Sequence, residues 1–203
     1  MLSEIQALGP ALAMVELCDL PSGLVALDAL AKEAPVVVVG AGTIHHGHFL
    51  IVFAGSVAEV EMSYARAIER AEAAIVDRVL LPDAEPRLLP ALSRGERRPP
   101  LVGDALGMLE ARSSPTLVGA VDAALKGTDV ELVELRLAEG LGGKALASLW
   151  GYQHDVDAAV ELAAKRLERG RFEGSSTTVI ANAHPEVTRV LGGGTRFFKE
   201  QFG

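Results

Sequence analysis

Cysteine is almost absent from this sequence of 203 residues, in which Cys18 stands alone. A single thiol cannot form a disulfide within the chain, and it cannot build a cysteine-only metal site. Unpaired cysteines are usually small buried residues, and we expect that of Cys18. The scarcity of cysteine is typical of a protein from a reducing cytoplasm.

Basic charge and long apolar runs are also lacking. Lys and Arg number 19 against 27 for Asp and Glu, which gives a net charge of −8, so no basic surface for nucleic acid is predicted. The longest uncharged apolar run covers residues 36–44, about half of a membrane span. Residues 1–9 contain Glu4 and no basic residue, so no secretory signal is predicted. We therefore expect an acidic, cytoplasmic protein that binds neither nucleic acid nor membrane.

Aromatic residues make up only 4% of the chain, although 49% of it is hydrophobic. That apolar fraction excludes a disordered chain. Small side chains allow helices and sheets to approach closely, but they fill a large core poorly. The composition therefore favours thin units that bury further surface against neighbours, as in an oligomer.

The chain contains an internal repeat. When the sequence is shifted by 94 residues, 10 of the 28 positions between Ala11 and Val38 are identical, whereas about two or three would match by chance. The shift grows to 96 at Gly55 and to 99 at Asp83, which are changes of loop size. The chain is thus predicted to be a tandem duplication.

The segment 93–103 separates the two copies. It contains four charged residues and the pair Pro99-Pro100, which favours an extended, solvated connection. We place the first domain at residues 1–96 and the second at residues 97–203. The end of the second domain holds Phe197, Phe198 and Phe202, and either a docking patch or a disordered tail fits this segment.

Each copy has the same predicted order of elements. In the first copy, apolar and β-branched runs predict strands over 11–17, 36–39, 49–53 and 79–81. Helical spacing of apolar residues predicts helices over 21–32 and 57–74, the first opened by Pro21. The order β-α-β-β-α-β is the ferredoxin-like split-βαβ plan of the α/β (α+β) class, with both helices on one face of an antiparallel-rich sheet.

Motifs in both copies occur in matching order. Ala-Leu-x-Met-x-Glu ends at Glu16 and at Glu110, and an Asp-Ala pair precedes Lys32 and Lys126. The second copy adds a loop ending in Gly-Leu-Gly-Gly-Lys144 and a segment Ala-Asn-Ala-His184-Pro-Glu. With these motifs, nearly the whole chain resembles a tandem-domain shell protein of bacterial microcompartments.

The resemblance implies a homotrimer that imitates the cyclic hexamers of single-domain family members. It also implies a structural role, in which small metabolites diffuse selectively through a central pore and other shell proteins bind laterally. The loop between the second and third strands of each copy would line that pore. The pore-lining residues would be Ile44, His45, His46, Gly47, His48, Gly140, Leu141, Gly142, Gly143 and Lys144.

The first of these loops is similar to a loop of tandem shell proteins from propanediol-type compartments, which carry an iron–sulfur cluster on the threefold axis. Their loop reads Ile-Cys-Pro-Gly-Lys-Phe-Leu, and His45 stands here at the position of the cluster cysteine. Because such a cluster needs thiolate ligands, we do not expect one. This likeness therefore assigns no cofactor to the chain.

Two interpretations of the histidine cluster stay open. His45, His46 and His48 could form a polar, pH-sensitive pore rim. Alternatively, three copies of His45 could hold a metal ion on the trimer axis, such as Zn²⁺, with a metal- or electron-transfer role. On an extended segment His45 and His46 would point in opposite directions, so we expect only one of them to face the axis.

The outer edges of the tile are predicted from matched positions. Lys32 and Lys126 would pack against neighbouring tiles, or they would simply complement the ends of their helices. Family members also use an arginine flanked by prolines, where this chain has Asn182 before His184. The edge contact through Lys32, Lys126, Asn182 and His184 is therefore expected to be weaker or differently made.

No catalytic constellation is found. The loop before Lys144 lacks the Ser or Thr of a phosphate-binding loop, since Ala145 follows, and no nucleophile is accompanied by a base. We predict a shell component and not an enzyme. A catalytic or ligand-binding ferredoxin-like protein is the remaining alternative, and saturable turnover or binding in a cleft away from the axis would support it.

Overall fold

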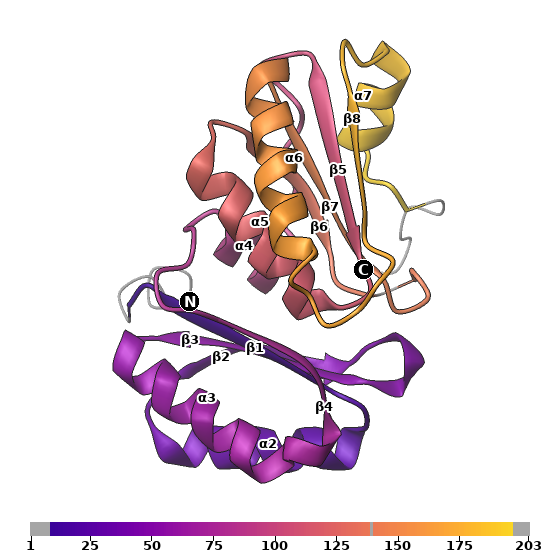
Figure 1. The fold of residues 1–203 in the computed structure, drawn as a ribbon. Coiled ribbons are helices and arrows are strands. Elements are labelled where there is room, and N and C mark those ends of the chain that lie inside the picture. Colours follow the sequence, from indigo (N-terminus) through magenta and orange to yellow (C-terminus); the bar gives the residue numbers. More distant parts are fainter. Residues whose placement is uncertain (1–8, 139, 197–203) are drawn as a thin grey trace.

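The computed structural model describes residues 9–138 and 140–196. The three phenylalanines at positions 197, 198 and 202, for which a docking patch and a disordered tail were both left open, lie outside the described residues. The chain forms two α/β halves that lie one above the other (Figure 1). We call β1 to α4 the first half and β5 to α7 the second half.

The first half follows the predicted order of elements. Its sheet has the strand order β2-β3-β1-β4, and each neighbouring pair is antiparallel. The elements are β1 (Ala11–Leu17), α2 (Leu20–Glu33), β2 (Val37–Thr43), β3 (Phe49–Gly55), α3 (Val57–Ala71), β4 (Ile75–Leu81) and α4 (Leu88–Arg94). A short 3-10 turn, Glu72–Ala74, separates α3 from β4.

The second half repeats this arrangement with the strand order β6-β7-β5-β8. Its elements are β5 (Ala105–Ala111), α5 (Ser114–Gly127), β6 (Glu131–Arg136), β7 (Ala145–Gly151), α6 (Gln153–Leu167), β8 (Ser176–Ile180) and α7 (Pro185–Gly192). The α/β class, with two sheets that each carry helices, is thereby confirmed. The division at residue 96 stays a prediction, since α4 ends at Arg94 and β5 begins at Ala105.

Several boundaries differ from the prediction. The strand predicted over 36–39 continues to Thr43, because main-chain pairing with β3 carries it through glycines that lack a strand-like side-chain pattern. The last strand begins at Ile75, four residues before the predicted start at Val79 and directly after the predicted helix. Helices α4 and α7 were not predicted, since they are only 7 and 8 residues long and show too few turns to display a periodicity.

Matched N-caps begin the first helix of each half. The Asp19 carboxylate accepts a hydrogen bond from Ser22 N at 2.8 Å, and Ser113 Oγ accepts one from Thr116 N at 3.3 Å. A proline follows in the first turn of both helices, where its missing N–H leaves no helical bond unmade. Helix α3 begins with a capping box formed by Ser56 and Glu59.

Strand β1 is buried on both faces. Ala13, Val15 and Leu17 pack with α2 and α3 in one core. Leu12 and Met14 point the other way and belong to a second core that contains the buried aliphatic side chains of α5. In Figure 1, α5 and α4 lie over the face of the first sheet that α2 and α3 leave uncovered. The two halves therefore share a continuous hydrophobic core.

Gly23 in α2 provides a test of this packing. A Cβ atom there would lie 2.6 Å from the Cβ of Phe49, with further overlap on its ring. We expect Gly23→Ala to lower the free energy of unfolding by about 1–2 kcal/mol, because overpacking outweighs the better helix propensity of alanine. Chemical denaturation followed by circular dichroism measures it. Gly192→Ala, at a helical glycine facing open space, is the matched control, and an equal effect of both substitutions would contradict the packing argument.

Candidate pore loops and the interface between the halves

The two predicted pore loops lie against each other in the chain. Nε2 of His46, from the loop between β2 and β3, lies 2.5 Å from the carbonyl oxygen of Gly142, from the loop between β6 and β7. Gly143 has a φ of +84°, and a Cβ there would overlap the imidazole ring of His46. Glycine is therefore required at this close approach. Figure 1 shows both hairpins on the same side of the molecule.

The histidine segment is not extended, which corrects the premise on which His45 and His46 were expected to point in opposite directions; which of them faces the axis stays a prediction. His45–Gly47 form a 3-10 turn, closed by a 2.9 Å hydrogen bond from Ile44 N to the carbonyl oxygen of His48. His46 adopts a φ of 69°, a left-handed conformation that is uncommon for residues with a side chain. Both His45 and His46 are exposed, whereas Ile44 packs against the shared core. The alternation argument therefore does not apply to this turn.

The third histidine of the cluster lies against a buried carboxyl group. His48 Nδ1 lies 2.8 Å from Oε1 of Glu16, whose residue is only 1% exposed. The other carboxylate oxygen of Glu16 accepts a hydrogen bond of 3.2 Å from Ser114 N, at the start of α5. Burial raises the pKa of Glu16, although the hydrogen bonds from His48 and Ser114 act in the opposite direction. One carboxylate thus joins a pore loop to the second half of the chain.

The second half contains a corresponding pair. Lys144 Nζ lies 2.7 Å from Oε1 of Glu110, and both side chains remain about one-third exposed. Glu16 and Glu110 hold matching positions on β1 and β5, and His48 and Lys144 each follow a matching loop glycine. The recurrence of these glutamates was visible in the sequence, but their partners were not. The alignment of Gly47 with Gly143, together with the strand register, would have shown both pairs.

Hydrogen bonds between side chains and backbone also join the first half to α5 and the loop that follows it. Arg87 donates bonds of 2.7 Å to the carbonyl oxygens of Leu125 and Val130. Asp122 Oδ1 accepts a 2.8 Å bond from Glu85 N. Because these contacts satisfy carbonyl and carboxylate groups near the end of α5, they fix the helix on the first sheet.

The predicted edge residues have local partners in the chain. Lys32 is exposed and pairs with Asp28, while Lys126 pairs with Asp122 and also binds the carbonyl oxygen of Asp83. Asn182 occupies a turn with a φ of 47°. His184 caps α7 by accepting a 3.2 Å bond from Glu186 N. Contact of these residues with a neighbouring tile stays a prediction.

Neither a metal site nor a cluster site is formed by the described residues. Within ranges 9–138 and 140–196, no group of three or more His, Cys, Asp or Glu side chains is arranged to hold a metal ion. The loop that would carry an iron–sulfur cluster lacks a thiolate, so its residues do not fit such a cluster. Cys18 is exposed and lies 3.2 Å from Asp19 Oδ2, which corrects the prediction that it is buried.

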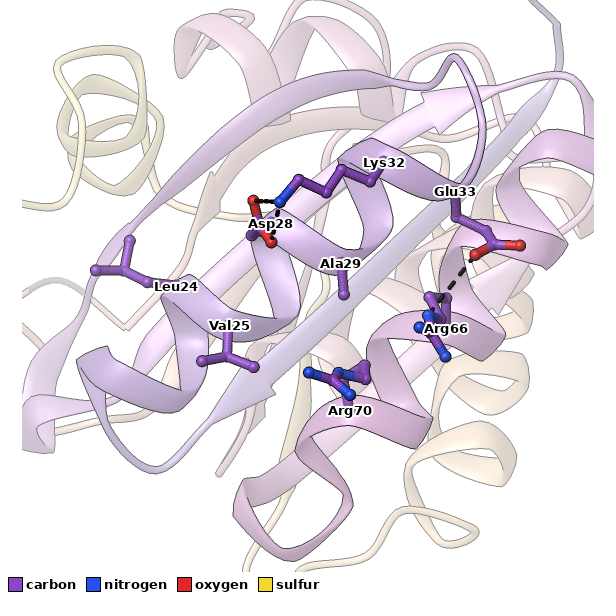
Figure 2. A pocket seen from close by; sticks show the side chains of 8 residues that line it. All are labelled: Leu24, Val25, Asp28, Ala29, Lys32, Glu33, Arg66 and Arg70. Atoms are coloured by element: carbon purple, nitrogen blue, oxygen red, sulfur yellow. Dashed lines mark hydrogen bonds and ion pairs between the residues drawn. The ribbon is translucent and has the colours of Figure 1, made fainter.

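A groove lies between α2 and α3 on the side of the first half away from the second (Figure 2). Leu24, Val25, Arg66 and Arg70 line it, and Glu33 reaches Arg66 across it at 3.7 Å. The corresponding surface of α5 is covered by the first sheet. Leu24 is 51% exposed, whereas Val118 at the matching position of α5 is fully buried. The chain thus covers this helix surface in one half and leaves it open in the other.

Comparisons with known proteins agree with this architecture. A family model for the BMC domain matches residues 11–84 and again residues 105–183. The bacterial microcompartment shell protein PduT of Citrobacter freundii is 32% identical over 185 residues, which cover 89% of this chain and 97% of that protein. The carboxysome assembly protein CcmO of Synechocystis is 28% identical over 83% of this chain and 60% of its own length.

Solved structures show the same likeness. The crystal structure of a microcompartment protein from Desulfitobacterium hafniense is 31% identical, with a TM-score of 0.73 over 88% of this chain and 98% of that one. A fused permuted hexameric shell protein of the RMM microcompartment shares the fold at 19% identity and a TM-score of 0.57, over 82% of this chain and 89% of that one.

The chain belongs to the BMC domain family and carries two copies of the domain in tandem. It is a microcompartment shell protein of the tandem-domain class and not an enzyme, in agreement with relatives that are shell or assembly proteins. In the described ranges, no helix has both the length and the apolar character needed to cross a membrane.

Glu16 provides a test of the link between the loop and the interface. Glu16→Ala removes the acceptor for Ser114 N–H and His48, and we expect a loss of about 1–3 kcal/mol in the free energy of unfolding. Glu16→Gln retains an acceptor and should cost less. Denaturant titration of both variants and the wild type measures this difference.

The pH dependence has a defined sign. Because burial raises the pKa of Glu16 above 4.5, the folded chain binds this proton more tightly than the unfolded chain does. The contribution of Glu16 to stability is therefore complete below pH 4.5 and decreases as the pH rises through the raised pKa. The stability of Glu16→Gln relative to the wild type should accordingly increase as the pH rises above 4.5 and through the raised pKa of Glu16. Parallel pH profiles of the two proteins would contradict this assignment.

Proposed function

We propose that three copies of this chain form a pseudohexameric tile of a microcompartment shell, with a central pore lined alternately by the two loops. The observation that carries the proposal is the packing of α5 against the first sheet, set beside the open surface of α2. Val118 and Asp122 of α5 are buried in the chain, whereas the matching Leu24 and Asp28 of α2 are exposed. A second copy, presenting its second sheet to α2, would bury that surface in the same way.

This pairing gives a closed ring. The contact of sheet with helix is head to tail, and such contacts form rings when the rotation between units closes. Three contacts within chains and three between chains would place six domains around one axis. The likeness to tandem and fused shell proteins supports this number.

The two loops would then meet at the centre of the tile. The contact of His46 with Gly142 supports their placement at a common edge. The pore would be lined by Ile44 to His48 and by Gly140 to Lys144. His48 and Lys144 are paired with glutamates and His46 lies against the carbonyl oxygen of Gly142, so the exposed His45 is the imidazole that would face the opening. Diameter and lining charge would select which small metabolites cross.

The tile would join other shell proteins laterally through Lys32, Lys126, Asn182 and His184, in the shell of a bacterial microcompartment in the cytoplasm. Lys32 supports such a contact, because it is exposed at the end of α2 and carries a charge within reach of a neighbour. Lys126 would contribute less, since it already binds the first half of its own chain.

Native mass spectrometry of the purified protein tests the trimer. Three chains of 21.3 kDa give a species of about 64 kDa, or twice that mass if tiles stack. Dilution should dissociate the trimer without a stable dimer, because a dimer would keep only one of the three contacts between chains. Monomers or dimers alone at micromolar concentrations would contradict the tile and the pore assignment with it.

Permeability of reconstituted tiles tests the role of His45. Histidine changes charge between about pH 5 and about pH 8, and three protonated imidazoles at a constriction favour anions. The anion-to-cation conductance ratio in planar bilayers should therefore increase on acidification, and His45→Ala should reduce this increase. His154→Ala, at an exposed histidine of α6, is the control. If the conductance ratio changes neither with pH nor on His45→Ala, the proposed role of His45 in ion selection is contradicted.

A further inference from the structure

A polar contact between the halves shows how the copies of the chain would recognise one another. Asp77, on β4, is buried and accepts hydrogen bonds from the hydroxyl of Ser113 and from Thr116 N at 3.1 Å. Thr116 Oγ1 also donates to it at 2.6 Å. Ser113 is the N-cap of α5. An acid on the sheet therefore binds a hydroxyl at the helix N-terminus, where negative charge is favoured.

The strand register identifies the residue that stands in place of Asp77 in the second half. Glu16 on β1 pairs with Asp77 on β4, and Glu110 on β5 pairs with Ser176 on β8. Because Glu16 and Glu110 are matching positions, Ser176 corresponds to Asp77. The N-cap of α2, corresponding to Ser113, is Asp19. The acid and the hydroxyl have exchanged places between the two halves.

Both exchanged residues are accessible in the chain. Ser176 is exposed on the face of the second sheet opposite α5 and α6, and its neighbours along β8 alternate in burial. Asp19 accepts bonds from the side chains of Cys18 and Ser22 and from Ser22 N. Each lies on the surface that the proposed ring contact would cover.

We propose that the carboxylate of Asp19 in one copy of the chain accepts a hydrogen bond from the hydroxyl of Ser176 in the next copy, and that this exchanged pair selects the order of domains in the ring. The proposal rests on the trimer proposed above. It assigns a specific partner, a second copy of this chain, and a specific contact to the open end of α2.

The exchange discriminates between correct and incorrect pairings. When the first sheet packs on α5, Asp77 meets Ser113. When the second sheet packs on α2, Ser176 meets Asp19. Each of these pairings joins one acid to one hydroxyl. The first sheet on α2 would instead oppose Asp77 and Asp19, two carboxylates that repel each other across a buried contact. The second sheet on α5 would oppose two hydroxyls and leave the helix N-terminus without an acid.

Some contacts between the halves join a side chain to a backbone group, and these need no exchange of residue types. At these positions the two halves have the same residues. Asp122 binds Glu85 N and Lys126 binds a carbonyl oxygen, and the matching residues of the first half are again Asp28 and Lys32. A backbone group is the same in every copy, so one side chain suffices. Only the contact between two side chains requires a complementary change on each side, and there the sequence differs.

Charge exchange by mutation tests the proposal. Ser176→Asp places a second carboxylate opposite Asp19 at each of three ring contacts, and we expect the protein concentration at half-dissociation of the trimer to increase about tenfold or more. Adding Asp19→Ser recreates the pair found within the chain and should restore this concentration to near the wild-type value. Serine also caps helices well, so α2 is retained. Size-exclusion chromatography with light scattering measures each variant.

Two further variants make the result specific. Gln153→Glu adds the same charge at an exposed residue of α6, on the opposite face of the second sheet, and should leave the trimer unchanged. Ser176→Ala removes only the hydroxyl and should weaken the trimer by a smaller factor than Ser176→Asp, with no change in the circular dichroism spectrum. It provides an answer even if Ser176→Asp fails to fold.

The outcomes separate this proposal from the one on which it rests. If the wild type forms a trimer but Ser176→Asp and Ser176→Ala dissociate like the wild type, the contact is wrong and the tile stands. The same conclusion follows if Asp19→Ser fails to rescue a folded Ser176→Asp variant. If the wild type forms no trimer, both proposals fail together.

Discussion

The burial of both faces of a four-stranded sheet is the constraint on which this structure depends. Each sheet covers one face with its own two helices, and β1 is apolar on both sides. Without the second half, only α4 would cover the face of the first sheet that holds Leu12 and Met14. Helix α5 of the second half removes this surface from solvent and gains hydrophobic free energy roughly in proportion to the area covered. The tandem chain thus contains a contact between two BMC domains within one molecule.

A few polar residues fix the orientation of α5 on the first sheet. Acids on the first sheet lie against the N-terminus of α5, where unpaired N–H groups and the helix dipole favour negative charge. Glu16 does so through Ser114 N, and Asp77 does so through Thr116 N. Glu16 also binds His48, so the same carboxylate holds the base of a predicted pore loop. The position of the loop between β2 and β3 is therefore coupled to the position of the second half.

Duplication has allowed the two halves to diverge where a hexamer of identical domains could not. His48 pairs with a buried glutamate, whereas Lys144 pairs with one that is about one-third exposed. The loops also differ, since imidazole rings in one lie against bare glycine backbone in the other. A ring built from such chains would present two chemistries in alternation around its axis. Asp19, Ser113, Asp77 and Ser176 extend the same divergence to the contacts between domains.

The sequence by itself determined the duplication, the order of strands and helices, the BMC family and the two loops, because these follow from residue identity and local periodicity. It also indicated that Glu16 and Glu110 recur. The short helices, the continuation of β2 to Thr43 and the exposure of Cys18 were decided by the tertiary structure. So were the partners of Glu16, at positions 32 and 98 residues away in the chain. Such partners depend on sheet register and on the packing of one half against the other, and a local pattern carries no information about contacts made at that separation.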